Sequence, residues 1–244
     1  MNAIHALTAT RLRLASEMQD QLHKAGRYDP DYTATGNAKR VAERRAQIQA
    51  EFAGRAAKID ADVVAAAQRI KTEAAVVRPR TDLNSPVDLI RTEQAWRNIV
   101  LPQLEQGRSL REALAHADVD GVLGAERFAS AYLRTKAGTA SGLTSTHVHY
   151  DAEGRPLTVR TEIDLKHLDL TITARLAELT PEHAEVIRLA GRVDHDVSAH
   201  REASIEVDRG DALSAAITAQ LSQYDVYAAL DTDTASSAAA GVDA

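Results

Sequence analysis

The chain of 244 residues contains no cysteine, one tryptophan and only 4% aromatic residues. The absence of cysteine excludes a disulfide framework, zinc–thiolate sites and thiol catalysis. Because aromatic rings are so few, the core must consist mainly of aliphatic side chains and alanine, and alanine favours closely packed helices. Residues 1–21 lack the apolar run of a signal peptide, and no segment approaches the length of a membrane span. We therefore expect no membrane partner.

Short motifs that carry common chemistry are also missing. The sequence has no P-loop, no Gly-x-Gly-x-x-Gly turn and no nucleophile elbow. Asp118-x-Asp120-Gly121 has the outline of a calcium loop, but its glycine stands two positions early and Ala129 replaces the required glutamate. We predict no catalytic residue, no cofactor and no small-molecule substrate, and interpret the protein as non-enzymatic.

The clearest pattern that is present is an eleven-residue repeat within residues 37–78. Eleven residues make three helical turns, so residues at this spacing lie along one side of one long helix. That helix would be roughly 60 Å long at 1.5 Å per residue. Large apolar residues form two such series: Val41, Phe52 and Val63, then Ile48, Ile59 and Ile70. Smaller residues are expected to widen the apolar stripe: Ala42, Ala46, Ala50, Ala53, Ala57 and Ala61.

Neighbouring helices are predicted to run antiparallel to the long helix and to cover its apolar stripe. Apolar residues at helical spacing from Ile4 to Leu22 predict a first helix, which Gly26 would end in a left-handed conformation. A further helix is expected to begin after Ser85, where a serine cap is followed by proline. This second neighbour would cover the distal part of the long helix, around residues 59–77.

Residues 110–136 have the outline of a helix-turn-helix. A capping box formed by Ser109 and Glu112 starts one short helix, residues 118–124 read as a turn, and residues 125–134 take the position of a recognition helix. Basic residues there would meet DNA phosphates: Arg127, Arg134 and Lys136. Acidic residues would repel them: Asp118, Asp120 and Glu126. Two helices that merely pack together have the same outline.

The apolar period changes after a Gly-, Ser- and Thr-rich segment at residues 139–145, which we interpret as a linker between a helical domain, residues 1–138, and a smaller α+β domain, residues 146–230. Alternation with period two in residues 146–176 predicts a β-meander of two or three strands. A helical stripe also fits Leu168, Ile172 and Leu176, so strand or helix remains open there. Residues 231–244 are expected to form a disordered tail.

Two groups of side chains are candidates for metal binding. His147-x-His149-x-Asp151 would place three ligands on one face of a strand, although a solvated hairpin shows the same pattern. Asp196 and His200 stand four residues apart on a helix, where a carboxylate and an imidazole can pair or share a metal. For the second group we favour an ordinary surface pair, and we assign no metal to either.

The net charge of −6 is unevenly distributed along the chain. Residues 1–80 carry 14 Lys or Arg against 9 Asp or Glu, whereas the remainder carries 15 against 26. Opposite charge on the two parts favours head-to-tail contact between copies, with the basic outer face of the long helix meeting the acidic C-terminal part.

The predicted helices are long and rich in alanine, and the sequence contains no convincing catalytic or ligand-binding motif. These features point to a structural or assembly role. We hypothesise a scaffold- or connector-type subunit of a larger complex, such as a phage virion or its assembly apparatus. Its partners would be other copies or other structural proteins, in the cytoplasm or in a virion. The alternative is a DNA-binding regulator that uses residues 110–136, and the third is a metal-dependent enzyme that uses His147, His149 and Asp151.

Overall fold

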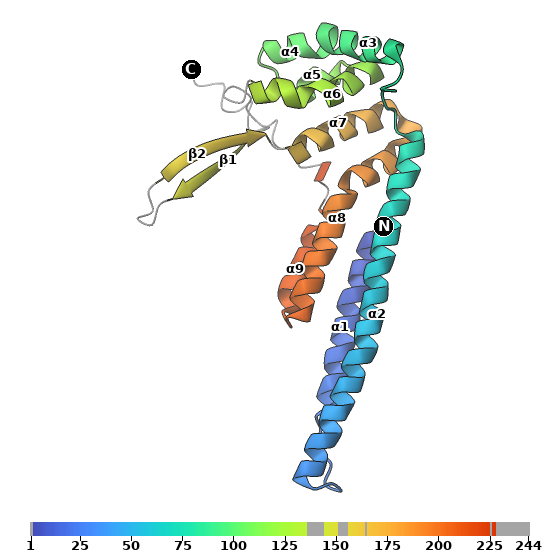
Figure 1. Ribbon diagram of the computed structural model, residues 1–244, viewed down its shortest axis with the longest axis vertical. Coiled ribbons are helices and arrows are strands. Elements are labelled where there is room, and N and C mark those ends of the chain that lie inside the picture. The colour runs from blue at the N-terminus through green and yellow to red at the C-terminus, as the bar shows by residue number, and fades with distance from the viewer. Residues whose placement is uncertain (1, 136–143, 151–155, 164, 225, 228–244) are drawn as a thin grey trace. The chain divides into compact units, whose positions relative to one another are not determined.

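The computed structural model describes residues 2–135, 144–150, 156–163, 165–224 and 226–227, and these ranges are mainly helical (Figure 1). The prediction of a mainly α protein is confirmed. Within the described ranges, no helix combines the length and the apolar character needed to cross a membrane. The helices are α1 (Ala3–Ala25), α2 (Ala34–Val77), α3 (Pro86–Ala95), α4 (Leu101–Glu105), α5 (Leu110–Ala115), α6 (Val119–Thr135), α7 (Leu165–Leu179), α8 (Ala184–Asp208) and α9 (Ala212–Leu221).

Contacts between residues divide the chain into two units, each described here by itself. The first unit comprises Met1–Thr72 and Val193–Tyr224, and the second comprises Glu73–Arg192 with the described residues that follow Asp225. This grouping differs from the predicted division at residues 139–145, because helices from both ends of the chain share the first unit. Most of the predicted linker and all of the predicted tail, residues 231–244, lie outside the described residues.

The predicted long helix is α2, and its apolar series faces the interior of the first unit. Ile48, Phe52 and Val63 are almost fully buried. The remaining members are half-buried: Val41, Ile59 and Ile70. The predicted widening of this stripe is wrong, because the smaller residues are exposed: Ala42, Ala46, Ala50, Ala53, Ala57 and Ala61. The buried face of α2 at these positions is therefore narrower than predicted and consists of the row of large side chains.

Helix α1 forms the predicted antiparallel hairpin with α2. Ile4 near the start of α1 packs with Val63, whereas Leu14 farther along α1 packs with Ile48 and Phe52. The helix ends at Ala25 as expected. The predicted left-handed conformation of the next residue, Gly26, is wrong, because its φ of −77° and ψ of −4° are right-handed.

The covering helix over the distal part of α2 in the first unit is α8. Val193 of α8 packs in one cluster with Val63 of α2, and Val197 lies against that cluster. The helix after Ser85 was predicted for this role. Ser85 does cap α3, since its side chain accepts a hydrogen bond from the Asp88 N–H, but α3 packs on α6 in the second unit.

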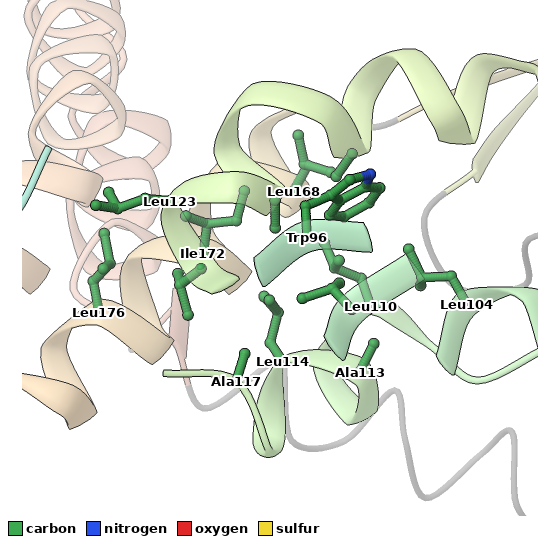
Figure 2. Close-up of a cluster of buried hydrophobic side chains, with 14 of the residues drawn as sticks. Trp96, Leu104, Leu110, Ala113, Leu114, Ala117, Leu123, Leu168, Ile172 and Leu176 are labelled. Atoms are coloured by element: carbon green, nitrogen blue, oxygen red, sulfur yellow. The ribbon is translucent and has the colours of Figure 1, made fainter. Parts of the chain in front are cut away.

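The second unit has a largely aliphatic core between α4, α5, α6 and α7. Figure 2 shows Leu110 and Leu114 of α5 lying near Ile172 of α7, with Trp96 beside them. Trp96 belongs to a π-helical turn, Trp96–Val100, which leads directly into α4 with Pro102 in its first turn. Its ring centre lies 6.2 Å from that of Phe128 and 6.2 Å from that of Tyr132. The rings of α6 therefore lie against the only tryptophan of the chain.

Helix α6 begins earlier than the sequence suggested. A turn was predicted over residues 118–124, but α6 starts at Val119 and includes Gly121 and Gly124. Asp118 accepts a hydrogen bond from the Gly121 N–H at 2.9 Å, which satisfies one of the free N–H groups at the helix start. The glycines were read as turn residues. Gly124 instead lets α6 approach α3 closely, because its missing side chain faces the backbone at Thr92.

Two strands pair in an antiparallel sheet, β1 (Thr144–Tyr150) with β2 (Pro156–Ile163). The structure does not support a β-meander beyond this pair. The segment from Leu168 to Leu176, for which strand was one interpretation, lies in α7. Leu168, Ile172 and Leu176 are buried at spacings of four residues, so packing against the second unit's core selected the helical pattern over the alternating one.

A test of the close approach at Gly124 is substitution by alanine. A methyl group there would overlap the Thr92 carbonyl oxygen and lie 2.8 Å from the Trp96 Cβ atom. We expect Gly124→Ala to lower the free energy of unfolding by about 1–3 kcal/mol, because the helices would have to separate. Urea unfolding followed by Trp96 fluorescence measures this change.

The matched control is Gly54→Ala in α2, where no described atom lies within 4 Å of the added methyl group. This change should stabilise the helix by about 0.5–1 kcal/mol, because alanine loses less backbone entropy than glycine. Equal effects at the two glycines would show that contact with α3 does not constrain Gly124.

The capping box at the start of α5 predicts a defined pH dependence. The backbone N–H and then the hydroxyl of Ser109 donate to the Glu112 carboxylate and lower its pKa below the ordinary value. A lowered pKa stabilises the fold above the pKa of an unfolded glutamate, about 4.3, and that contribution is lost as the pH falls through the folded pKa. Glu112→Gln should therefore unfold with a shallower pH dependence between about pH 5 and pH 3. Urea titrations at several pH values test this, and an unchanged slope would contradict it.

Candidate functional site

Asp196 and His200, the helical candidates for metal binding, lie in α8 and are buried, with 1% and 5% of their surface exposed. They contact different partners. The Asp196 carboxylate accepts a hydrogen bond from the Asn2 amide and lies 3.1 Å from Nε2 of His5. The favoured interpretation as a surface pair is therefore wrong.

His200 lies between α1 and α2. Its Nδ1 is 3.0 Å from the Thr8 hydroxyl, and its Nε2 is 3.0 Å from Oδ1 of Asp60. Thr8 donates its hydroxyl proton to the carbonyl of Ile4, and the carboxylate of Asp60 can only accept. The imidazole of His200 therefore bridges a hydroxyl of α1 and a carboxylate of α2.

These contacts belong to a row of polar residues that joins α1 to α8. On α1 the polar residues recur every three positions and on α8 every four, which is how a three-residue ridge of one helix meets a four-residue ridge of another. We call this row the polar seam; its members are Asn2, His5, Thr8 and Arg11 of α1 and Asp196, His200, Ser204 and Asp208 of α8. The Ser204 hydroxyl is buried without a hydrogen-bond partner among the described residues.

Arg11 ends the polar seam and is 5% exposed. Its Nη2 donates to Oδ1 of Asp208 at 2.5 Å, and its Nε lies 3.9 Å from Oδ1 of Asp60. Burying a guanidinium without a carboxylate partner would be costly. Asp208 at the end of α8 therefore stabilises the charge that α1 buries.

The seam could have been recognised from an interruption in the apolar pattern of α1. Ile4, Leu7, Leu14 and Met18 follow a stripe in which Arg11 occupies the missing position. A charged residue on the inner face of a helix requires a partner. The acidic partners lie almost 200 residues later, so no residue near Arg11 in the sequence indicates them.

Charge complementarity operates within the first unit. Residues 1–72 carry 12 Lys or Arg against 8 Asp or Glu, and residues 193–224 carry 2 against 6. The two segments meet at the polar seam and at an exposed pair between Lys71 and Asp194, 2.7 Å apart. The basic and acidic segments that were expected to attract each other between copies therefore already meet within one chain.

An open pocket follows the polar seam along α1 and α2, beyond the end of α8. Its volume is about 340 Å³. We call it the hairpin groove; it is lined by Arg11, Leu14, Ala15, Met18, Gln49, Phe52, Ala53, Ala56, Ala57, Asp60 and Asp208. Charged residues line one part of it, and the remainder is mostly apolar with several alanines. Asp208 is the only α8 residue in this lining.

Helix α9 is apolar on two faces. Its small residues Ala215 and Ala219 pack with Ala15 of α1 and with Ala203 and Val207 of α8. The large residues of α9 and of the turn that follows it are exposed, and we call them the α9 stripe: Leu213 (73%), Ile217 (49%), Leu221 (63%) and, beyond the helix end, Tyr224 (74%). No charged residue occurs in residues 212–224. A contiguous exposed apolar face of this kind is typical of an interaction surface.

The segment proposed for DNA binding forms part of the second unit. Arg127 donates to the Leu89 carbonyl at 3.0 Å and to the Thr92 hydroxyl at 2.5 Å, so α3 engages its guanidinium. Two acidic residues also have partners, since Arg78 donates to Glu126 at 2.8 Å and Arg91 lies 2.9 Å from Asp120. Lys136 lies outside the described residues.

Negative charge gathers near α6. Burial and then the charge of Glu126 raise the pKa of Asp169 above its ordinary value, and the positive charge of Arg78 only partly opposes this. Because burial is the larger cause, the raised pKa shows first that the Asp169 carboxyl is shielded from water, and only second that the charge of Glu126 reaches it.

The remaining metal candidate falls on β1 and beyond it. His147 and His149 lie opposite Arg160 and Thr158 in the backbone register of the sheet. Their side chains and Asp151 lie outside the described part of the chain. Among the side chains that are described, no group of three or more His, Asp or Glu is arranged to hold a metal.

Comparisons with known proteins returned no matching family model, no matching curated protein and no matching solved structure.

A substitution in α8 tests the stabilising role of the polar seam. Asp196→Ala removes a buried acceptor from Asn2 and His5, and we expect it to lower the free energy of unfolding by about 1–3 kcal/mol. Asp194→Ala, two residues away, removes only the exposed pair with Lys71 and should cost at most about 0.5 kcal/mol. Urea unfolding followed by circular dichroism compares them, and equally small losses would contradict a stabilising seam.

Proposed function

We propose that the protein is a non-enzymatic structural subunit that builds a larger assembly through exposed apolar surfaces of its first unit. A phage virion or its assembly apparatus is the setting that we propose, by general analogy with helical assembly subunits. The observation that carries the proposal is the α9 stripe. Four large apolar side chains on a charge-free segment remain exposed to water, while Ala215 and Ala219 on the opposite face of the helix are buried.

The energetics of the α9 stripe support an interaction role. Burying a large apolar side chain contributes about 1.5–3 kcal/mol, so a helix that leaves such residues exposed forgoes several kcal/mol in the isolated chain. Sequences that serve only the fold would place polar residues on that face. Covering the stripe with another protein recovers this free energy.

The polar seam supports the same role. Its buried groups mostly bind one another, so they are engaged in holding α8 against α1. A satisfied polar row fixes how two helices align, because a shift along the axis would leave buried donors and acceptors without partners. A defined alignment gives the surfaces of the first unit a fixed shape for a partner.

The contacts of α6 favour this function over a DNA-binding regulator. Arg127, which the regulator would turn toward phosphate, already binds Leu89 and Thr92. Acidic residues lie on the same helix, including Glu126. The assembly role needs no such rearrangement.

Light scattering on the purified full-length protein tests the proposal. We expect a defined oligomer whose mass stays constant over a range of protein concentration. A monomer or dimer that binds duplex DNA at physiological salt would contradict the proposal and support the regulator. A stoichiometric transition metal in the same sample would instead support the metal-dependent enzyme.

A further inference from the structure

The hairpin groove continues a helix-binding surface that the first unit already uses. α8 lies along α1 and α2, with Val193 packed beside Ile4 and Val63 and with Asp208 reaching Arg11 (Figure 1). After Asp208 the α8 helix ends, and α1 and α2 continue without it. The groove is therefore a surface that can accept side chains of another helix, because α8 does not cover it.

The groove has the size and the chemistry for large aliphatic side chains. An apolar cavity of about 150 Å³ takes one benzene molecule, so a groove of about 340 Å³ takes two side chains of leucine or isoleucine size. Alanines on its floor leave the space that large residues of another helix would enter, as knobs enter holes. Two of its charged residues, Asp60 and Asp208, each lie within ion-pair distance of the third, Arg11.

The α9 stripe has the complementary features. Leu213, Ile217 and Leu221 stand four residues apart, which is the spacing of side chains that enter one groove. The stripe cannot occupy the groove of its own chain, because α9 is held on α1 and α8 by its opposite face. No charge on the stripe would have to lose its water in the contact.

We propose that the α9 stripe of one copy docks in the hairpin groove of a second copy. The exposed side chains of the stripe offer on the order of 500 Å² of surface, which is the share of one partner in an interface of the smallest specific size. Because stripe and groove are different surfaces, each copy still has one of each to offer. The contact either closes as a symmetric pair with two such interfaces or continues into rings or filaments.

This proposal rests on the proposed assembly function and specifies its contact. The absence of cysteine makes engineered thiols clean probes. We expect a mixture of Ile217→Cys and Ala57→Cys proteins to form a disulfide-linked dimer on mild oxidation, several-fold more than either variant alone. In the control mixture, Val64→Cys replaces Ala57→Cys. Val64 also lies on α2 and is 63% exposed, but it is outside the groove lining, so this mixture should not crosslink above background.

Charge substitution gives an independent measurement. Ile217→Glu should weaken association at least tenfold in light scattering, because a carboxylate would enter the groove, whereas the control Val64→Glu should associate as the unchanged protein does. Both positions are exposed, so unfolding midpoints should stay close to that of the unchanged protein.

The outcomes separate the two proposals. If the Ile217→Cys protein alone forms as much disulfide-linked dimer as the mixture does, the stripes of two copies contact each other. That result would overturn groove docking. A defined oligomer without the mixed crosslink would overturn the docking mode and leave the assembly function intact. A protein that stays monomeric at every concentration would contradict the self-association on which both depend.

Discussion

Buried charge on α1 and its acidic partners on α8 set the arrangement of the first unit. Arg11 and His5 lie on the inner side of the first helix, and neither can be buried there without an acceptor. Asp208 and Asp196 supply those acceptors from a helix near the other end of the chain. Their spacing also sets the alignment of α8 on α1, since a shift by one turn would separate each donor from its carboxylate. The apolar contacts of Ile4, Val63 and Val193 then close around this polar row.

The same arrangement explains which surfaces remain available. The opposite charges of the N-terminal and C-terminal segments largely neutralise each other inside the first unit, so long-range attraction between copies is weaker than the uneven sequence suggests. Two largely apolar surfaces remain exposed, namely the α9 stripe and the hairpin groove where α8 ends. Association through such surfaces would be driven by apolar burial more than by ion pairs, and would respond little to salt. A helical assembly subunit needs surfaces of this kind.

Much of the fold could be predicted wherever the signal is local. The eleven-residue series located α2, the capping boxes and proline positions located the starts of α3 and α5, and low aromatic content indicated an aliphatic, helical core. The failures came where two local patterns coincide. Gly121 and Gly124 suggested a turn although they lie in a helix, and the segment from Leu168 to Leu176 fits both strand and helix. In these cases the choice depended on what the segment packs against. The polar seam was missed because its two halves are almost 200 residues apart, so no local pattern joins them.

By itself, the sequence determined the long helix, its inward row of large residues and the ends of several helices, because side chains within a few positions of one another decide those features. Only the tertiary structure decided that α8 covers α2, that Asp196 and His200 are buried with separate partners, and that the alanines predicted to widen the stripe of α2 stay exposed. The physical reason is that burial and hydrogen-bond satisfaction are properties of contacts. A residue such as Arg11 shows in the sequence that a partner is required, but the fold decides which residue meets that requirement.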